Sequence, residues 1–184
     1  MPRRRKPASA LIIIDMINAL DFPQGASLLQ QALPVARRIA RLKQRLKAAA
    51  VPAIYVNDNF THWREDFGEL VAICSQDDIP GAPLARALPP ENDDYAILKP
   101  QHSAFYNTPL EVLLRQLGIV RVVLTGIAGD SCVLASTFDA RMRGFAPVVP
   151  RDCIASVTAQ RNRNAIAVMK SMEVEVTTAA KLVP

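Results

Sequence analysis

The chain has 184 residues, half of them hydrophobic, which is enough to bury a substantial core and argues against disorder. It carries 22 basic and 17 acidic residues, and four of the basic ones form the run RRRK at residues 3–6. The remaining chain is nearly neutral, has no basic stripe with interleaved aromatic residues and has no apolar run near the ~20 residues of a membrane helix, so we expect neither a nucleic acid nor a membrane as partner.

The cysteines are few, odd in number and widely spaced, at Cys74, Cys132 and Cys153. This pattern argues against a disulfide framework and is typical of a reducing compartment, so we expect a cytoplasmic protein. Residues 1–9 are predicted to form a basic, flexible tail, and residues 10–184 a single domain.

Short apolar runs alternate with helical patterns six times along the chain. The runs predict strands at 10–14, 53–56, 95–98, 122–124, 145–149 and 174–177. The helical patterns lie at 33–49, 69–75, 108–117, 132–143 and 156–171, with a loop at 79–83 and a basic, solvated face on the first helix. Unbroken apolar runs are typical of strands that are covered on both faces, so the alternation predicts an α/β fold with a mostly parallel sheet. Neither GxGxxG nor a P-loop is present, which argues against a dinucleotide or ATP cofactor.

Three residues with complementary chemistry follow three of these strands: Asp15 the first, Lys99 the third and Cys132 the fourth. Because the carboxyl ends of parallel strands share one edge of a sheet, we expect the three side chains to meet. An aspartate can take the thiol proton, and a lysine stabilises both carboxylate and thiolate. Cys132 also begins a predicted helix, where the dipole favours an ionised thiol. The structural alternatives are a packed cysteine, a turn aspartate and a surface lysine.

Several segments resemble the isochorismatase-like cysteine hydrolase family, whose members include nicotinamidases and N-carbamoylsarcosine amidohydrolases. They are IIID at 12–15, LKPQHSAF at 98–105, TGIAGDSCV at 125–133 and the later turn RDCIAS at 151–156. The resemblance extends over essentially the whole chain. It implies that residues 10–184 form one isochorismatase-like domain: a three-layer, doubly wound fold around a six-stranded, mostly parallel sheet with Rossmann-like strand order.

By this resemblance, Asp15, Lys99 and Cys132 form a catalytic triad that hydrolyses amides. The thiolate attacks the carbonyl, the amine leaves with a proton from Asp15, and Asp15 then acts as base while water hydrolyses the thioester. The family also implies a cis peptide bond between Ile127 and Ala128. The N–H groups of Ala128 and Cys132 are then expected to form the oxyanion hole.

The segment NDNFTHW at 57–63 departs from the nicotinamidases, which bind a metal there through an Asp-x-His pair. His62 and His102 are isolated histidines, so we expect no metal and no other cofactor. True isochorismatases lack the nucleophilic cysteine, so Cys132 argues against vinyl-ether hydrolysis.

Four residues after the second predicted strand are candidates for substrate binding, because they lie on the same sheet edge as the triad. The alternative is an ordered loop with one packed tryptophan. The candidates are Asn57, Asn59, Phe60 and Trp63.

The sequence thus predicts a cysteine hydrolase that cleaves a C–N bond, other than a peptide bond, in a small amide, ureido or carbamoyl compound. Two alternatives stay open: an isochorismatase-type hydrolase without covalent catalysis, and a non-catalytic member that binds a small molecule or partner through the same cleft. Proteins of this family are often oligomeric, so we expect a homo-oligomer, either a dimer or a tetramer.

Overall fold

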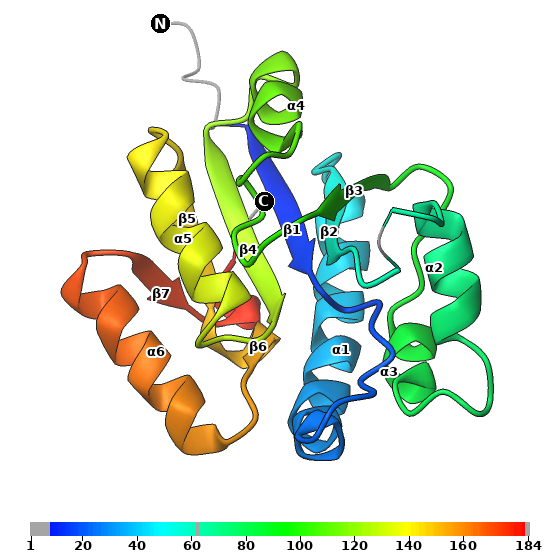
Figure 1. The fold of residues 1–184 in the computed structure, drawn as a ribbon. Coiled ribbons are helices and arrows are strands. Elements are labelled where there is room, and N and C mark those ends of the chain that lie inside the picture. The colour runs from blue at the N-terminus through cyan, green and yellow to red at the C-terminus, as the bar shows by residue number, and fades with distance from the viewer. Residues whose placement is uncertain (1–7, 62, 183–184) are drawn as a thin grey trace, which may run out of the picture.

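A computed structural model describes residues 8–61 and 63–182, so most of the predicted tail lies outside the described residues. Strands and helices alternate along the chain (Figure 1). The strands are β1 (Ser9–Ile14), β2 (Ala53–Asp58), β3 (Tyr95–Lys99), β4 (Arg121–Ile127), β5 (Ala146–Pro150), β6 (Ile154–Ala155) and β7 (Glu175–Thr177). The helices are α1 (Gly25–Lys47), α2 (Phe67–Cys74), α3 (Ala82–Ala87), α4 (Leu110–Gln116), α5 (Cys132–Met142) and α6 (Ala159–Ser171), with two short 3-10 helices, η1 (Arg151–Cys153) and η2 (Ala179–Lys181).

The strands form one sheet in the order β3-β2-β1-β4-β5-β7, and every pairing within the described residues is parallel. This is the Rossmann-like order expected from the resemblance, in which two halves of the sheet wind outward from the central strands. The seventh strand, β6, has two residues and pairs with the end of β4. The prediction of a doubly wound parallel sheet is confirmed, with β6 added to the six predicted strands.

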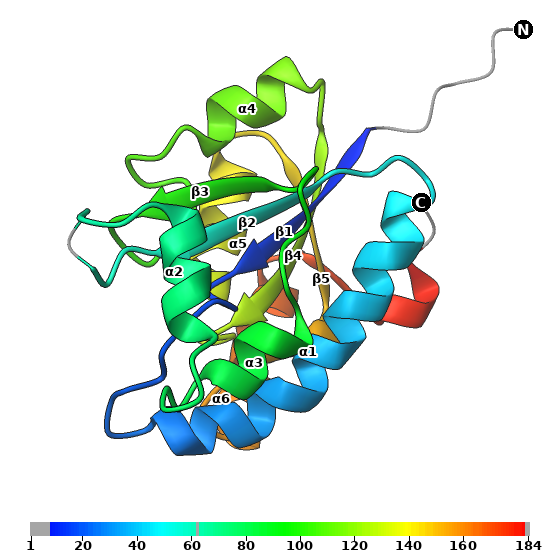
Figure 2. The same cartoon turned by 90° about the vertical axis from the view of Figure 1, so that its right-hand side faces the viewer.

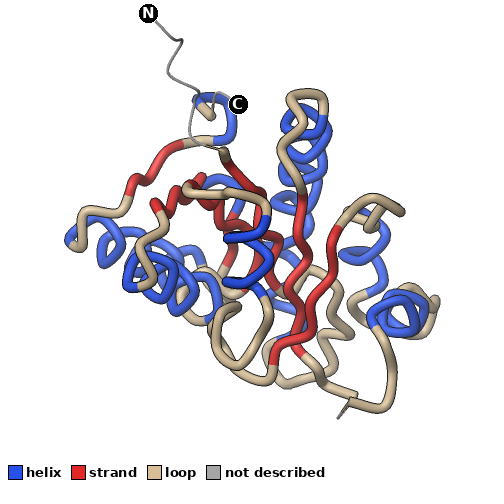
Figure 3. Tube along the Cα trace, turned by 90° about the horizontal axis from the view of Figure 1, so that it is seen from above, coloured by secondary structure: helices blue, strands red, loops and turns tan. Residues whose placement is uncertain are grey.

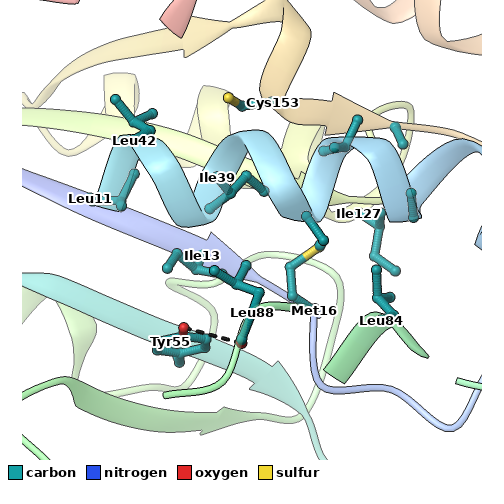
Figure 4. Close-up of a cluster of buried hydrophobic side chains, with 14 of the residues drawn as sticks. Leu11, Ile13, Met16, Ile39, Leu42, Tyr55, Leu84, Leu88, Ile127 and Cys153 are labelled. Atoms are coloured by element: carbon teal, nitrogen blue, oxygen red, sulfur yellow. Dashed lines mark hydrogen bonds between the residues drawn. The ribbon is translucent and has the colours of Figure 1, made fainter. Parts of the chain in front are cut away.

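Helices cover both faces of the sheet, as a parallel sheet requires (Figure 3). On one face lie α1 and α3, and on the other lie α4, α5 and α6 (Figure 2). Alternate residues of β1 serve the two layers: Leu11 and Ile13 pack under Ile39 and Leu42 of α1, as Figure 4 shows, whereas Ile12 faces the second layer. The apolar run of β1 is therefore buried because both of its faces are covered.

The clearest differences from the predicted boundaries concern α1 and α3. The first helix begins at Gly25, eight residues earlier than predicted, and continues through Pro34. Its apolar stripe extends back to the buried Leu28 and Ala32, so packing on the sheet outweighs the hydrogen bond that Pro34 removes. The predicted loop at 79–83 runs into α3, whose first turn accommodates a proline. No helix in the described part of the chain is long and apolar enough to cross a membrane.

Lys43 of α1 was expected on a solvated face, but its side chain is 3% exposed. Its ammonium group pairs with Asp94, lies 3.2 Å from a carboxylate oxygen of Glu91 and donates to the Tyr55 hydroxyl at 3.4 Å. Burying an ammonium group is unfavourable unless such partners surround it. Lys43 thereby ties α1 to the acidic turn that leads into β3.

Candidate active site

The structure brings Asp15, Lys99 and Cys132 together at the carboxyl edge of the sheet. Asp15 follows β1, Lys99 ends β3, and Cys132 begins α5 shortly after β4. The Lys99 Nζ lies 2.9 Å from Asp15 Oδ2 and 3.7 Å from Cys132 Sγ. An ammonium group therefore contacts both a carboxylate and a thiol.

Asp15 is held rigidly and away from solvent. It adopts a left-handed backbone conformation (φ 54°) and is 4% exposed. Its Oδ1 accepts a hydrogen bond from the Asp58 N–H at 2.7 Å, while Oδ2 faces Lys99. Since Asp58 lies beside Lys99 in the β2–β3 register, neighbouring strands hold the two carboxylate oxygens.

Lys99 is almost fully buried, with 1% of its surface exposed. Besides Asp15 and Cys132, its Nζ donates to the carbonyl oxygen of Gln101 at 3.1 Å. Three acceptors thus surround the three N–H bonds of the ammonium group, which compensates for its loss of water.

The turn between β4 and Cys132 depends on close backbone approach. Gly126 has φ 112°, and a Cβ there would lie 2.1 Å from the carbonyl oxygen of Ile14, the residue before Asp15. Only glycine fits this position. The peptide bond between Ile127 and Ala128 is cis, at the position named from the sequence. The turn therefore starts directly against the strand that carries Asp15.

The rest of the turn is held by the segment around β6. The Gly129 N–H donates to the Ala155 carbonyl at 2.7 Å, and the Asp130 N–H donates to the Ser156 hydroxyl at 3.1 Å. Residues 151–156, singled out in the sequence as a family-like turn, thus support the backbone that leads to Cys132.

Ser136 connects the start of α5 to the loop that follows Lys99. Its hydroxyl donates to the Cys132 carbonyl at 2.6 Å and accepts the Ala104 N–H at 2.8 Å. The first turn of α5 is thereby fixed to the loop that follows Lys99.

The surroundings of Cys132 favour its neutral thiol. Burial raises the pKa of its thiol to about 12, the Asp15 carboxylate adds to the rise, and Lys99 opposes it. Burial and the carboxylate thus both oppose the ionised thiol that is expected at a helix start.

The two charged partners are suited to accept and to stabilise the thiol proton. Burial raises the pKa of Asp15 although Lys99 counteracts it, so Asp15 is a stronger base than an exposed aspartate. Burial by itself lowers the pKa of Lys99, but attraction to Asp15 and Cys132 raises it overall. Lys99 therefore stays positively charged while a proton moves between sulfur and carboxylate.

His102 is a site residue that the sequence analysis considered only as an isolated histidine. Its Nδ1 lies 3.6 Å from Cys132 Sγ and 3.4 Å from the Ser131 hydroxyl. Its position three residues after Lys99, at the same strand end, was the available signal. The imidazole is exposed and lines a cavity of about 390 Å³. The other lining residues are Gln101, Ser103, Tyr106 and Asp139.

Asn57 lies next to Asp58 of the site, but its side chain forms hydrogen bonds with the protein backbone. Its side-chain oxygen accepts the Ile17 N–H at 3.1 Å, and its Nδ2 donates to the Ile17 carbonyl at 2.6 Å. The residue is 1% exposed, so it holds the loop after Asp15 rather than a substrate. This corrects its predicted role in substrate binding.

The other substrate-binding candidates lie nearer the surface. Asn59 Oδ1 accepts the Trp63 N–H at 2.9 Å, and its buried Nδ2 has no hydrogen-bond partner among the described residues. Trp63 is 61% exposed. Phe60 and Asp58 line a second cavity of about 340 Å³ together with residues 18–22. These residues remain candidates.

Within residues 8–61 and 63–182, no group of three or more His, Cys, Asp or Glu side chains could hold a metal ion. From the last residue of β2 the chain reads Asp58-Asn59-Phe60, which supplies no histidine two residues after the aspartate. His62 lies outside the described residues. Cys74 and Cys153 are free and pack in a hydrophobic core cluster.

Comparison with known proteins shows the family of this chain. The family model for the isochorismatase domain matches residues 9–181. The uncharacterized isochorismatase family protein YaaI from Bacillus subtilis (strain 168) is 34% identical over 97% of this chain and 98% of its own. Ureidoacrylate amidohydrolase RutB from Enterobacter sp. (strain 638) is 30% identical over 78% of this chain and 74% of its own.

Among solved structures, N-carbamoylsarcosine amidase from Thermoplasma acidophilum superimposes with a TM-score of 0.71, at 22% identity, over 96% of this chain and 99% of its own. At that identity the likeness concerns the fold. The match of the family model over nearly the whole chain, together with the YaaI relative, confirms the resemblance seen in the sequence. This chain belongs to the isochorismatase family.

Proposed function

We propose that the protein is a metal-independent cysteine hydrolase that cleaves the C–N bond of a small amide, ureido or carbamoyl compound. The observation that carries this proposal is the buried Lys99 ammonium group, 2.9 Å from the Asp15 carboxylate and 3.7 Å from the Cys132 thiol. A nucleophile, a base and a fixed positive charge in mutual contact are the parts that covalent amide hydrolysis requires.

The reaction begins with proton transfer from Cys132 to Asp15. The thiolate then attacks the substrate carbonyl, and the N–H groups of Ala128 and Cys132 stabilise the oxyanion, an interaction worth on the order of 3 kcal/mol. The C–N bond breaks, and Asp15 returns its proton to the departing nitrogen. Water then hydrolyses the thioester on Cys132, with Asp15 acting as the base. Lys99 keeps the carboxylate and the thiolate close together throughout.

The names of the relatives support this class of substrate. One is an amidohydrolase of ureidoacrylate, and a structural neighbour is an amidase of N-carbamoylsarcosine. A ureido and a carbamoyl group both present a planar carbonyl bonded to nitrogen. Asn59, Phe60 and Trp63 are the residues that we propose contact the remainder of the substrate.

A panel of ureidoacrylate, N-carbamoylsarcosine and nicotinamide, followed by ammonia release, tests the activity. We expect turnover of a ureido or carbamoyl member, loss of turnover in Cys132→Ala, and a substrate-derived adduct on Cys132 in the intact mass of quenched wild-type reactions. Full turnover by Cys132→Ala would instead indicate non-covalent, isochorismatase-type hydrolysis. Specific binding of a panel compound without turnover would indicate a non-catalytic member.

We further propose that the protein is a cytoplasmic homo-oligomer, a dimer or a tetramer, with one domain after the basic N-terminal tail. Three free cysteines in the described part agree with a reducing compartment. Light scattering coupled to size-exclusion chromatography measures the mass of the assembly. A monomer at micromolar concentration would contradict the proposed oligomer.

A further inference from the structure

We propose that a cavity between α1 and α6 binds the phosphate group of a small molecule. The site is separate from the proposed hydrolysis, since none of the triad residues lines it. The cavity has a volume of about 300 Å³, and residues of α1, η1, β6 and α6 line it. Its charged lining residues are Arg38, Arg151, Asp152 and Arg163.

The three arginines of this cavity are not neutralised by the protein. Within residues 8–61 and 63–182, neither Arg38 nor Arg151 forms a hydrogen bond or an ion pair. Arg163 donates to the neutral side-chain oxygen of Gln160 at 2.6 Å, which leaves its charge uncompensated. Arg161, in contrast, points elsewhere and pairs with the Asp130 carboxylate. The arginines at the cavity are therefore available to an anion from outside.

The lining keeps an excess of positive charge even though it contains a carboxylate. Asp152 uses its Oδ1 to accept the Ala179 N–H at 2.8 Å. Three guanidinium groups thus stand against one carboxylate in a single cavity. All three arginines are exposed, so a ligand can reach them from solvent. Like charges that share a cavity repel one another, and a bound anion would relieve this repulsion.

A phosphate ester matches these arginines better than a carboxylate does. It brings three terminal oxygens and close to two negative charges, whereas a carboxylate brings two oxygens and one charge. Guanidinium groups donate two parallel N–H bonds to such oxygens. The cavity is larger than a phosphate ion and lies at the lower end of the size range of small-molecule sites, so it also has room for a small organic group.

One wall of the cavity also supports the turn that leads to Cys132. The carbonyl of Ala155 accepts the Gly129 N–H, and the Ser156 hydroxyl accepts the Asp130 N–H. The Ser156 hydroxyl in turn donates to the side-chain oxygen of Asn162 at 3.1 Å. A ligand that orders this wall should therefore slow hydrogen exchange both in residues 151–163 and in the turn at 129–130.

Calorimetric titration with inorganic phosphate at constant ionic strength, set with sodium chloride, tests the site. We expect saturable binding of about one phosphate per chain in the wild type and affinity lowered about 10-fold or more in Arg38→Met, Arg151→Met and Arg163→Met, since each loses a charge-assisted contact. Arg37→Met is the matched control. It removes a neighbouring exposed arginine of α1 that does not line the cavity, and its affinity should equal that of the wild type. Thermal unfolding in chloride alone checks that every variant is folded.

Two further ligands and the exchange pattern identify the class of ligand and the place. Glycerol 3-phosphate should bind at least as well as phosphate, and citrate should bind more weakly. The proposal is overturned if the response to phosphate does not saturate, if Arg37→Met loses as much affinity as Arg38→Met, if citrate binds more tightly, or if exchange slows around Lys99 instead of residues 151–163. Failure of the proposed function is distinguishable, because phosphate binding should be unchanged in Cys132→Ala.

Discussion

Replacing Lys99 by methionine tests whether the ion pair at the site is as tightly coupled as its geometry indicates. The substitution leaves the Asp15 carboxylate buried, 4% exposed, without its positive partner 2.9 Å away. Removing one member of a buried pair typically lowers the free energy of unfolding by about 3–5 kcal/mol. Protonation of Asp15 limits this loss of stability. The interval from its ordinary pKa of 3.8 to pH 7 is roughly three pH units, and each unit is worth about 1.4 kcal/mol, so the loss is at most about 4 kcal/mol.

The sign of the pH dependence follows from the same argument. In Lys99→Met, native Asp15 holds its proton above pH 3.8 while the unfolded chain loses it, so the native state binds more protons and stability falls as pH rises. The deficit relative to wild type should therefore be largest near pH 7 and should shrink toward pH 4. Urea unfolding of both proteins across this range measures it.

The double variant Asp15→Asn/Lys99→Met provides the decisive comparison. Because the double variant removes both charges, its loss of unfolding free energy at pH 7 should be smaller than the sum of the losses in the two single variants. Lys47→Met is the control, since Lys47 pairs with Glu91 and Asp93 at the surface and should change stability little. Additive single effects, or a deficit that does not depend on pH, would refute the reasoning.

Three further predictions concern residues around the site. Alkylation of Cys132 by iodoacetamide should have a midpoint well above the roughly 8.5 of a free thiol, and Asp15→Asn should lower it, because the carboxylate raises the thiol pKa; a wild-type midpoint below 8.5 contradicts this. Gly126→Ala places a Cβ 2.1 Å from a β1 carbonyl and should destabilise by several kcal/mol in thermal unfolding, whereas Gly118→Ala, with φ 65° and nothing within 4 Å, should lose only about 1–2 kcal/mol. Similar losses at both glycines would contradict the clash. Asn57→Ala leaves a buried N–H and a buried carbonyl of the loop after β1 unpaired and should lower stability by about 2–4 kcal/mol in urea, and an unchanged midpoint would count against that role.

Much of the fold follows from local pattern. The unbroken apolar run before Asp15 and the run that opens β4 are buried on both faces, and such runs are typical of the centre of a parallel sheet. From that topology alone, the ends of β1, β3 and β4 share one edge, which is why Asp15, Lys99 and Cys132 could be grouped before their distances were known. The strand order itself and the family were expected from the resemblance of whole segments.

Other features depend on packing between distant segments, which periodicity does not report. The apolar pattern predicted that α1 starts at residue 33, yet the sheet also buries Leu28 and Ala32 in the turns before it. The helical pattern placed Lys43 on a basic, solvated face of α1, yet in the structure it is buried against acidic residues of the turn before β3.

At the site itself, the sequence by itself determined which chemical groups are present and at which edge of the sheet they lie. Only the tertiary structure decided their protonation and their neighbours. Burial beside Asp15 raises the pKa of the Cys132 thiol, although the start of a helix favours the opposite, and His102 reaches the sulfur because the loop after β3 folds back against α5. The physical reason is that a side chain's charge and contacts depend on the dielectric and the groups that surround it in space, and these come from segments far apart in the chain.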